Sequence, residues 1–168
     1  MLSEAEASMK PKTYLTNGPS QTKKLGEAWA KEISRGWLKD VALSVGLEGD
    51  LGGGKTTFLQ GFAKGLGIKE KILSPTFVIM KKFQIPNYKF QTNSKFKIPK
   101  FKNFYHIDCY RIKNPKELLD LRFKEIISNP QNIVAIEWAE KVKKILPQRV
   151  LAVRFDFIDK NKRRITFE

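Results

Sequence analysis

Residues 47–58 read LEGDLGGGKTTF, and this stretch decides the fold. Gly49, four residues, and then Gly54, Lys55 and Thr56 reproduce the G-x-x-x-x-G-K-[ST] spacing of a phosphate-binding loop. The glycines allow backbone conformations that other residues resist, so that several N–H groups can point toward one anion. In such a loop the lysine reaches the β and γ phosphates, and the threonine hydroxyl binds Mg²⁺. The stretch therefore predicts a site for a nucleoside triphosphate and Mg²⁺.

The residues on either side of the loop fit a strand and a helix. The run VALSVGL at 41–47 is mostly apolar and predicts a buried strand that leads directly into the loop. Residues 55–66 predict a helix that ends at Gly67, with one apolar side formed by Phe58, Leu59, Phe62 and Leu66. Strand, glycine loop and helix are the context that the motif requires.

The remaining elements follow from hydrophobic periodicity. A helix with Ser20 or Thr22 as N-cap should carry an apolar stripe of Leu25, Trp29, Ile33 and Trp37. We expect a short strand around Tyr14 and strands at 76–83, 103–108, 132–137, 150–158 and 164–167. Helical pieces should fill 115–128 and 139–146. This order predicts an α/β fold, a P-loop NTPase-like three-layer sandwich whose mostly parallel sheet has an antiparallel hairpin at one edge. We expect a loose lead-in at 1–19 and a single P-loop ATPase domain at 20–168.

Composition narrows the class of protein. The 168 residues contain no apolar run of membrane-spanning length and no signal-peptide pattern at the N-terminus, so we expect a cytoplasmic protein without membrane contact. One cysteine, Cys109, excludes an intrachain disulfide, and one histidine, His106, does not build a zinc site alone. The net charge of +15 indicates either affinity for nucleic acid or a lysine-rich composition without functional meaning.

A phosphate-binding loop needs a carboxylate for the metal, normally at the end of an apolar strand. Asp108 follows FYHI and Glu137 follows IVAI, and the sequence does not show which of the two holds the metal. All 11 glycines lie at or before Gly67, which excludes a glycine-bearing GTPase switch downstream. The stretch NKRR at 161–164 lacks the aspartate that reads guanine, which favours adenine as the base.

Three further motifs follow the loop in order: SPTF at 74–77, HIDCYR at 106–111 and IEWAE at 136–140. Together with GDLGGGKTT, this set resembles the TsaE family of bacterial ATPases required for threonylcarbamoyladenosine formation on tRNA, over about residues 22–153. The resemblance implies a small P-loop domain that binds ATP and Mg²⁺ and associates with the TsaB and TsaD proteins. TsaD would perform the carbamoyl transfer, and ATP hydrolysis by this chain would keep the cycle turning over.

The resemblance also implies roles for individual residues. Catalytic roles fall to Lys55, Thr76 and Asp108, and the Mg²⁺ ligands would be Thr56, Glu137 and Asp108. Ser74 and Thr76 would face the γ phosphate, and Tyr110 would lie beside the nucleotide. The expected nucleotide-binding residues are Asp50, Leu51, Gly52, Gly53, Gly54, Lys55, Thr56, Thr57, Arg111 and Trp138. We expect Lys55 to occupy a surface position between loop and helix.

The sequence departs from the family pattern at three places. Gly53 stands where alanine is usual, and Cys109 stands where an apolar residue is usual, so we expect Cys109 to be a small buried hydrophobe. Residues 81–104 form a link longer than the family's usual one, with seven lysines, six aromatic residues and no acid. Such a segment either contacts tRNA directly or forms a surface hairpin whose aromatic residues cover the sheet.

Three functions therefore remain open at the level of sequence. The first is an ATPase subunit of a tRNA-modification complex. The second is a small-molecule or nucleoside kinase, which would need an acceptor pocket. The third is a nucleotide-gated module that binds RNA through its basic surface.

Overall fold

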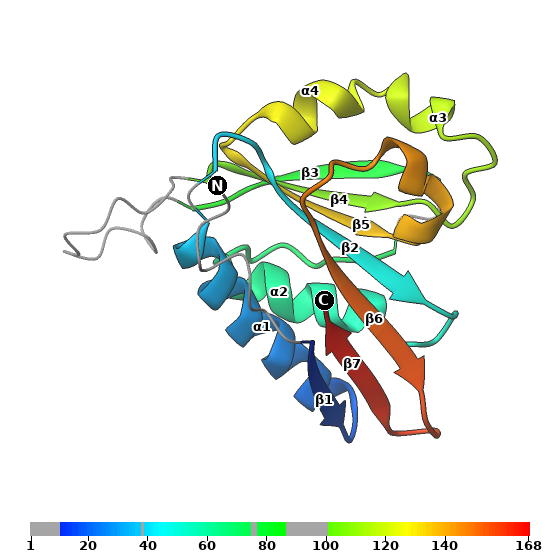
Figure 1. Ribbon diagram of the computed structural model, residues 1–168. Helices are drawn as coiled ribbons and strands as arrows, with labels where there is room; N and C mark the ends of the chain where they lie inside the picture. Colours follow the sequence, from blue (N-terminus) through cyan, green and yellow to red (C-terminus); the bar gives the residue numbers. More distant parts are fainter. Residues whose placement is uncertain (1–10, 38, 75–76, 87–100) are drawn as a thin grey trace, which may run out of the picture.

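The computed structural model describes residues 11–37, 39–74, 77–86 and 101–168. Its centre is a sheet of seven strands in the order β1-β7-β6-β2-β5-β4-β3 (Figure 1). The strands are β1 (Lys12–Thr16), β2 (Leu43–Gly49), β3 (Met80–Gln84), β4 (Asn103–Asp108), β5 (Asn132–Glu137), β6 (Val150–Phe157) and β7 (Arg163–Phe167). The short strand expected around Tyr14 is confirmed as β1.

Parallel pairing holds the middle of the sheet together. β2 lies between β5 and β6 and is parallel to both, and β4 is parallel to β5. β3 pairs antiparallel with β4 at one edge, and β7 pairs antiparallel with both β6 and β1 at the other. The predicted parallel core is confirmed, and antiparallel pairs flank it on both sides instead of one.

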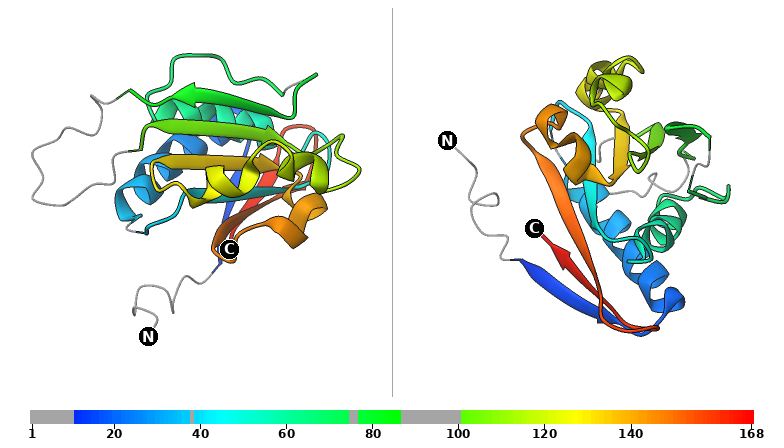
Figure 2. Two further views of the ribbon diagram at one scale, coloured as in Figure 1. Left: turned by 90° about the horizontal axis from the view of Figure 1, so that it is seen from above. Right: turned by 90° about the vertical axis from the view of Figure 1, so that its right-hand side faces the viewer.

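Helices cover both faces of the sheet (Figure 1; Figure 2). The helices α1 (Pro19–Gly36) and α2 (Lys55–Gly65) pack on one face, and α3 (Lys116–Leu119), α4 (Phe123–Ser128) and the 3₁₀ helix η2 (Ala139–Ile145) pack on the other. The predicted three-layer sandwich is thus confirmed. Within the described residues, no helix has both the length and the apolar content needed to cross a bilayer.

Each face of the sheet has its own hydrophobic core. On the α2 side, Phe58, Leu59 and Phe62 are fully buried against strand residues that include Val45 and Leu47. On the opposite side the buried residues include Leu118, Phe123, Val134, Ile136 and Val142. Because β5 is covered on both faces, all of its residues are buried, which explains why the central strands are apolar at successive positions.

α1 and α2 approach each other at glycines. A Cβ atom at Gly61 would lie 1.9 Å from the carbonyl oxygen of Lys23, and one at Gly26 would lie 2.3 Å from the carbonyl oxygen of Phe58. The predicted stripe of α1 faces this contact, with Ile33 buried and Trp29 half-buried against the core. Gly67 ends α2 as expected, with a φ of 86°.

Several helix and strand assignments differ in detail from the sequence predictions. Helix α1 begins at Pro19 with Gly18 as N-cap, so Ser20 and Thr22 were wrong as caps. The helical pieces expected at 115–128 are confirmed as α3 and α4, and the chain between them turns at Arg122, which has a left-handed φ of 60°. The helix expected at 139–146 is a 3₁₀ helix with a kink at Val142. The strand expected at 76–83 begins only at Met80.

The long lysine-rich link contributes two paired strand segments at its ends. Within it, Phe83 of β3 lies opposite Phe104 of β4, and both side chains are buried. The described ends of the link therefore belong to a hairpin whose aromatic residues cover the sheet. Residues 87–100 lie outside the described part of the chain, so direct contact of 81–104 with tRNA stays a prediction.

Candidate nucleotide-binding site

The loop between β2 and α2 has a backbone that requires glycine. Gly49, Gly52 and Gly54 have φ values of 131°, 76° and 99°, a region that side chains disfavour. A Cβ atom at Gly49 would also lie 2.3 Å from the carbonyl oxygen of Phe155. The loop ends at the N-terminus of α2, where unpaired backbone N–H groups and the helix dipole favour an anion.

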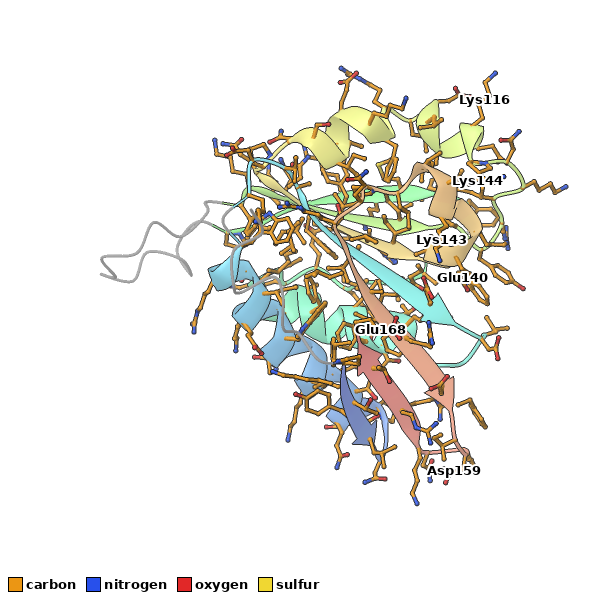
Figure 3. The ribbon with its side chains drawn as sticks, in the orientation of Figure 1. Lys116, Glu140, Lys143, Lys144, Asp159 and Glu168 are labelled. Atoms are coloured by element: carbon orange, nitrogen blue, oxygen red, sulfur yellow. The ribbon has the colours of Figure 1, made fainter. Side chains whose placement is uncertain are left out.

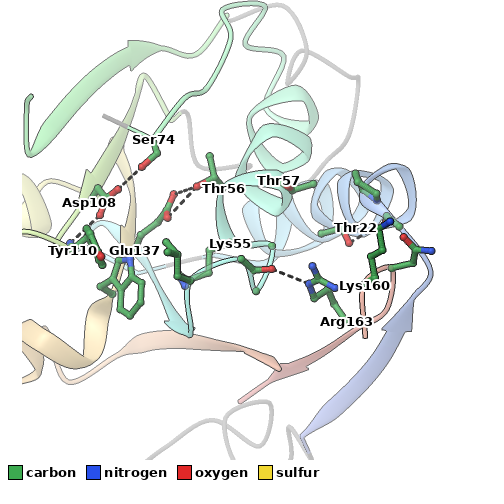
Figure 4. Close-up of a pocket in the computed structure, with 18 residues that line it drawn as sticks. Thr22, Lys55, Thr56, Thr57, Ser74, Asp108, Tyr110, Glu137, Lys160 and Arg163 are labelled. Carbon is green, nitrogen blue, oxygen red and sulfur yellow. Dashed lines mark hydrogen bonds between the residues drawn. The ribbon is translucent and has the colours of Figure 1, made fainter. Parts of the chain in front are cut away.

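A cavity of about 310 Å³ opens beside this loop (Figure 4). Most of the predicted site residues line it, namely Leu51, Gly52, Gly53, Gly54, Lys55, Thr56, Thr57, Ser74, Asp108, Tyr110, Glu137 and Trp138. Two predicted residues, Asp50 and Arg111, are exposed outside this lining. Thr76 lies outside the described residues. The fold thus brings residues from four separate stretches of the sequence, the loop and the three motifs that follow it, to one cavity.

Lys55 is buried, with only 5% of its surface exposed, so the expectation of a surface position was wrong. Its Nζ donates to the carbonyl oxygens of Gly49 at 2.5 Å and Asp50 at 2.9 Å, and it lies 4.1 Å from the centre of the Trp138 ring. Burial lowers the pKa of Lys55, and the nearby carboxylate of Glu137 opposes that shift. The carbonyl oxygens of the loop therefore hold the ammonium group in place.

Thr56 and Glu137 are hydrogen-bonded to each other beside Lys55. The Thr56 hydroxyl donates to the Glu137 carboxylate, with distances of 3.0 Å to Oε1 and 3.2 Å to Oε2 (Figure 4). Hydroxyl and carboxylate oxygens are the ligands that Mg²⁺ prefers, and Mg²⁺ commonly takes the rest from phosphates and water. No group of three or more His, Cys, Asp or Glu side chains able to hold a metal occurs among the described residues. The donor set fits a metal that is bound together with a phosphate ligand.

Asp108 lies next to Glu137 but makes different contacts. The two residues are register partners at the carboxyl ends of β4 and β5. Oδ2 of Asp108 accepts a hydrogen bond from the Ser74 hydroxyl at 2.7 Å, and Oδ1 accepts one from the backbone N–H of Tyr110 at 2.9 Å. The sequence did not show which of the two carboxylates is the better candidate for the metal. In the structure Glu137 contacts Thr56, and Asp108 contacts Ser74 of the SPTF segment.

Tyr110 and Trp138 are the aromatic residues that line the cavity. The rings of Tyr110 and Trp138 are 5.1 Å apart, and Tyr110 is 48% exposed. Trp138 adopts a left-handed φ of 58°, which turns the chain sharply after β5. This turn brings the indole ring over Lys55.

Sequence reasoning missed the residues that line the far end of the cavity. Arg163 of β7 donates from Nε to the carbonyl oxygen of Gly52 at 3.0 Å. Lys160 and Asn161, in the turn between β6 and β7, line the cavity with it, as do Gly18, Pro19 and Thr22 at the start of α1. These residues come from opposite ends of the chain, so no sequence motif predicts that they meet at one cavity.

Comparisons with known proteins agree on one family. The family model "TsaE: Threonylcarbamoyl adenosine biosynthesis protein TsaE" matches residues 16–165. The chain is 33% identical over 151 residues to the tRNA threonylcarbamoyladenosine biosynthesis protein TsaE of Rickettsia typhi, covering 89% of this chain and 90% of the relative. It is 35% identical over 162 residues to the Bacillus subtilis protein of the same name, covering 95% and 86%. The crystal structure of Bacillus subtilis YdiB superposes with a TM-score of 0.61 at 28% identity, covering 94% of this chain and 84% of that one.

Proposed function

The chain belongs to the TsaE family of threonylcarbamoyl adenosine biosynthesis proteins, and from this premise we propose that it is an ATPase that supports this modification of tRNA. The observation that carries the proposal is the geometry of the loop. The buried Lys55 ammonium and the Thr56–Glu137 pair lie at the N-terminus of one helix. A triphosphate needs a cation, backbone donors and a metal site together, and this arrangement supplies candidates for all three.

Each group would perform a distinct task toward ATP. Lys55 would leave the carbonyl oxygens of its own loop and neutralise charge on the β and γ phosphates. Thr56 and Glu137 would hold Mg²⁺, and the metal, when bound, would neutralise the negative charge that develops in phosphoryl transfer. Asp108 would orient the attacking water, and Thr76 stays a predicted contact of the γ phosphate.

The proposed partners are the TsaB and TsaD proteins. Hydrolysis by this chain would reset their tRNA-modifying cycle, so that activity would be weak for the isolated chain and stimulated by the pair. A small-molecule or nucleoside kinase is the alternative, because it would use the same loop and metal but transfer the phosphoryl group to an acceptor. A phosphorylated acceptor in place of free phosphate would favour that alternative.

The experiment that tests nucleotide binding compares two lysines by isothermal titration calorimetry with ADP and Mg²⁺. Lys55→Met removes the loop cation, and the control Lys116→Met removes a cation that points outward from α3 (Figure 3). Loss of a charge-assisted hydrogen bond corresponds to a ~10–100-fold weaker affinity, which we expect for Lys55→Met. The control should bind like the wild type. A wild-type chain that binds no adenine nucleotide would refute the proposal.

A further inference from the structure

A buried histidine of β4 contacts the carboxylate proposed to hold the metal. His106 is 1% exposed, and its Nε2 lies 2.9 Å from Oε1 of Glu137, which is itself 3% exposed. His106 and Asp108 are two residues apart on one strand, so both side chains point to the same face of the sheet. Because Asp108 is the register partner of Glu137, this face also carries the Glu137 side chain.

The hydrogen bonds around Glu137 fix the role of each atom. Oε1 accepts from the Thr56 hydroxyl at 3.0 Å and from His106 Nε2 at 2.9 Å. In this hydrogen bond an ionised carboxylate would accept, and Nε2 of His106 would donate. A buried carboxylate requires such partners, since burial without them is unfavourable. His106 therefore holds Oε1 from the β4 side while Oε2 also faces Thr56 at 3.2 Å.

We propose that His106 is a positioning residue that fixes the Glu137 carboxylate toward Thr56, so that Mg²⁺ meets a prearranged pair of oxygen ligands. The inference rests on the proposed function, because it concerns the same metal. Partners of metal ligands orient those ligands, and their loss typically weakens metal affinity ~10–100-fold. His106 would touch neither nucleotide nor metal, so its effect would pass through Glu137 alone.

The test measures the Mg²⁺ dependence of ADP affinity, as the ratio of the dissociation constants in EDTA and in Mg²⁺. His106→Leu removes the donor at similar volume, and His106→Asn leaves a polar group too short to reach Glu137. His106→Gln keeps an N–H donor near the position of Nε2. The matched control is Phe104→Leu, a buried substitution two residues earlier on the same face of β4, where Phe104 packs against Phe62 and Phe83.

The variants should separate positioning from simple loss of packing. We expect His106→Leu and His106→Asn to lower the ratio ~10–100-fold while binding in EDTA stays at the wild-type level. His106→Gln should restore most of the ratio, and Phe104→Leu should keep the wild-type ratio even if it unfolds at a lower temperature. If His106→Leu fails to fold, His106→Asn and His106→Gln carry the comparison. If His106→Asn or His106→Leu keeps the same ratio as the wild type, the role of His106 is refuted and the proposed function is untouched. If the wild-type protein itself binds no nucleotide, the proposed function is refuted.

Discussion

At the scale of single residues, the site depends on groups that are buried before any ligand arrives. Lys55 donates to two carbonyl oxygens of its own loop, and Glu137 accepts from Thr56 and His106. Nucleotide binding would exchange these internal contacts for contacts to phosphate and metal. The buried partners keep Lys55 and Glu137 close to the positions where a phosphate and a metal would need them.

The lowered pKa of Lys55 predicts a pH dependence of nucleotide binding. Burial favours the neutral amine, so in the free protein deprotonation begins below the ordinary lysine pKa of 10.5. The protonated form binds phosphate, hence affinity for ADP should fall as the pH rises toward 10.5. Titration calorimetry between about pH 7 and about pH 10 measures this fall. Lys55→Arg stays charged throughout this range and should show a flatter profile, and a flat wild-type profile would contradict the prediction.

The thiol of Cys109 should be inert in the folded protein. Cys109 is fully buried, as the sequence led us to expect, and burial raises its pKa to about 12. Only the thiolate reacts, so a disulfide reagent at about pH 8 should label the native chain negligibly. The same reagent in denaturant should label one thiol per chain, since Cys109 is the one cysteine. Rapid labelling without denaturant would show that the strand end opens.

At the scale of elements, the packing of α1 on α2 depends on glycine. Gly61→Ala would place a methyl group 1.9 Å from the backbone of Lys23, which α1 can relieve only by moving. Overpacking of this kind typically destabilises a protein by ~1–3 kcal/mol. Gly36→Ala, near the end of α1 with no atom within 4 Å of the added carbon, is the matched control and should be neutral or slightly stabilising. Chemical denaturation of both variants measures the difference, and equal stabilities would argue against close helix contact.

The sequence predicts the elements whose signals are local. β2, the loop and α2 were predicted correctly because each has its signal within about a dozen residues. The signal is an apolar run for β2 and an apolar side for α2. The sequence predicts helical pieces at 115–128 but not the position of the break between α3 and α4, because Arg122 adopts a left-handed conformation that its residue type does not indicate. The N-cap of α1 is Gly18 and not one of the expected residues. Thr22 is instead buried inside the helix, where its hydroxyl is hydrogen-bonded to the Thr16 hydroxyl at 2.8 Å, a contact that the local sequence does not indicate.

At the scale of the whole molecule, topology assembles the site. β2, β4 and β5 are parallel, so their carboxyl ends meet at one edge and deliver the loop, Asp108 and Glu137 to one cavity. The sequence predicts these three contributions, because each follows an apolar strand. It does not predict Arg163, which reaches Gly52 only through the pairing of β7 with β6.

The measurement that tests the central claim most directly is reconstituted tRNA modification. The chain would be combined with its cognate TsaB and TsaD, tRNA, ATP and Mg²⁺, and the modified nucleoside would be counted by mass spectrometry. The wild type and Lys116→Met should support many turnovers per TsaD, whereas Lys55→Met should support none beyond the level without the chain. Equal product with and without the wild-type chain, while ATP is still consumed, would contradict the account and direct attention to a phosphorylated acceptor.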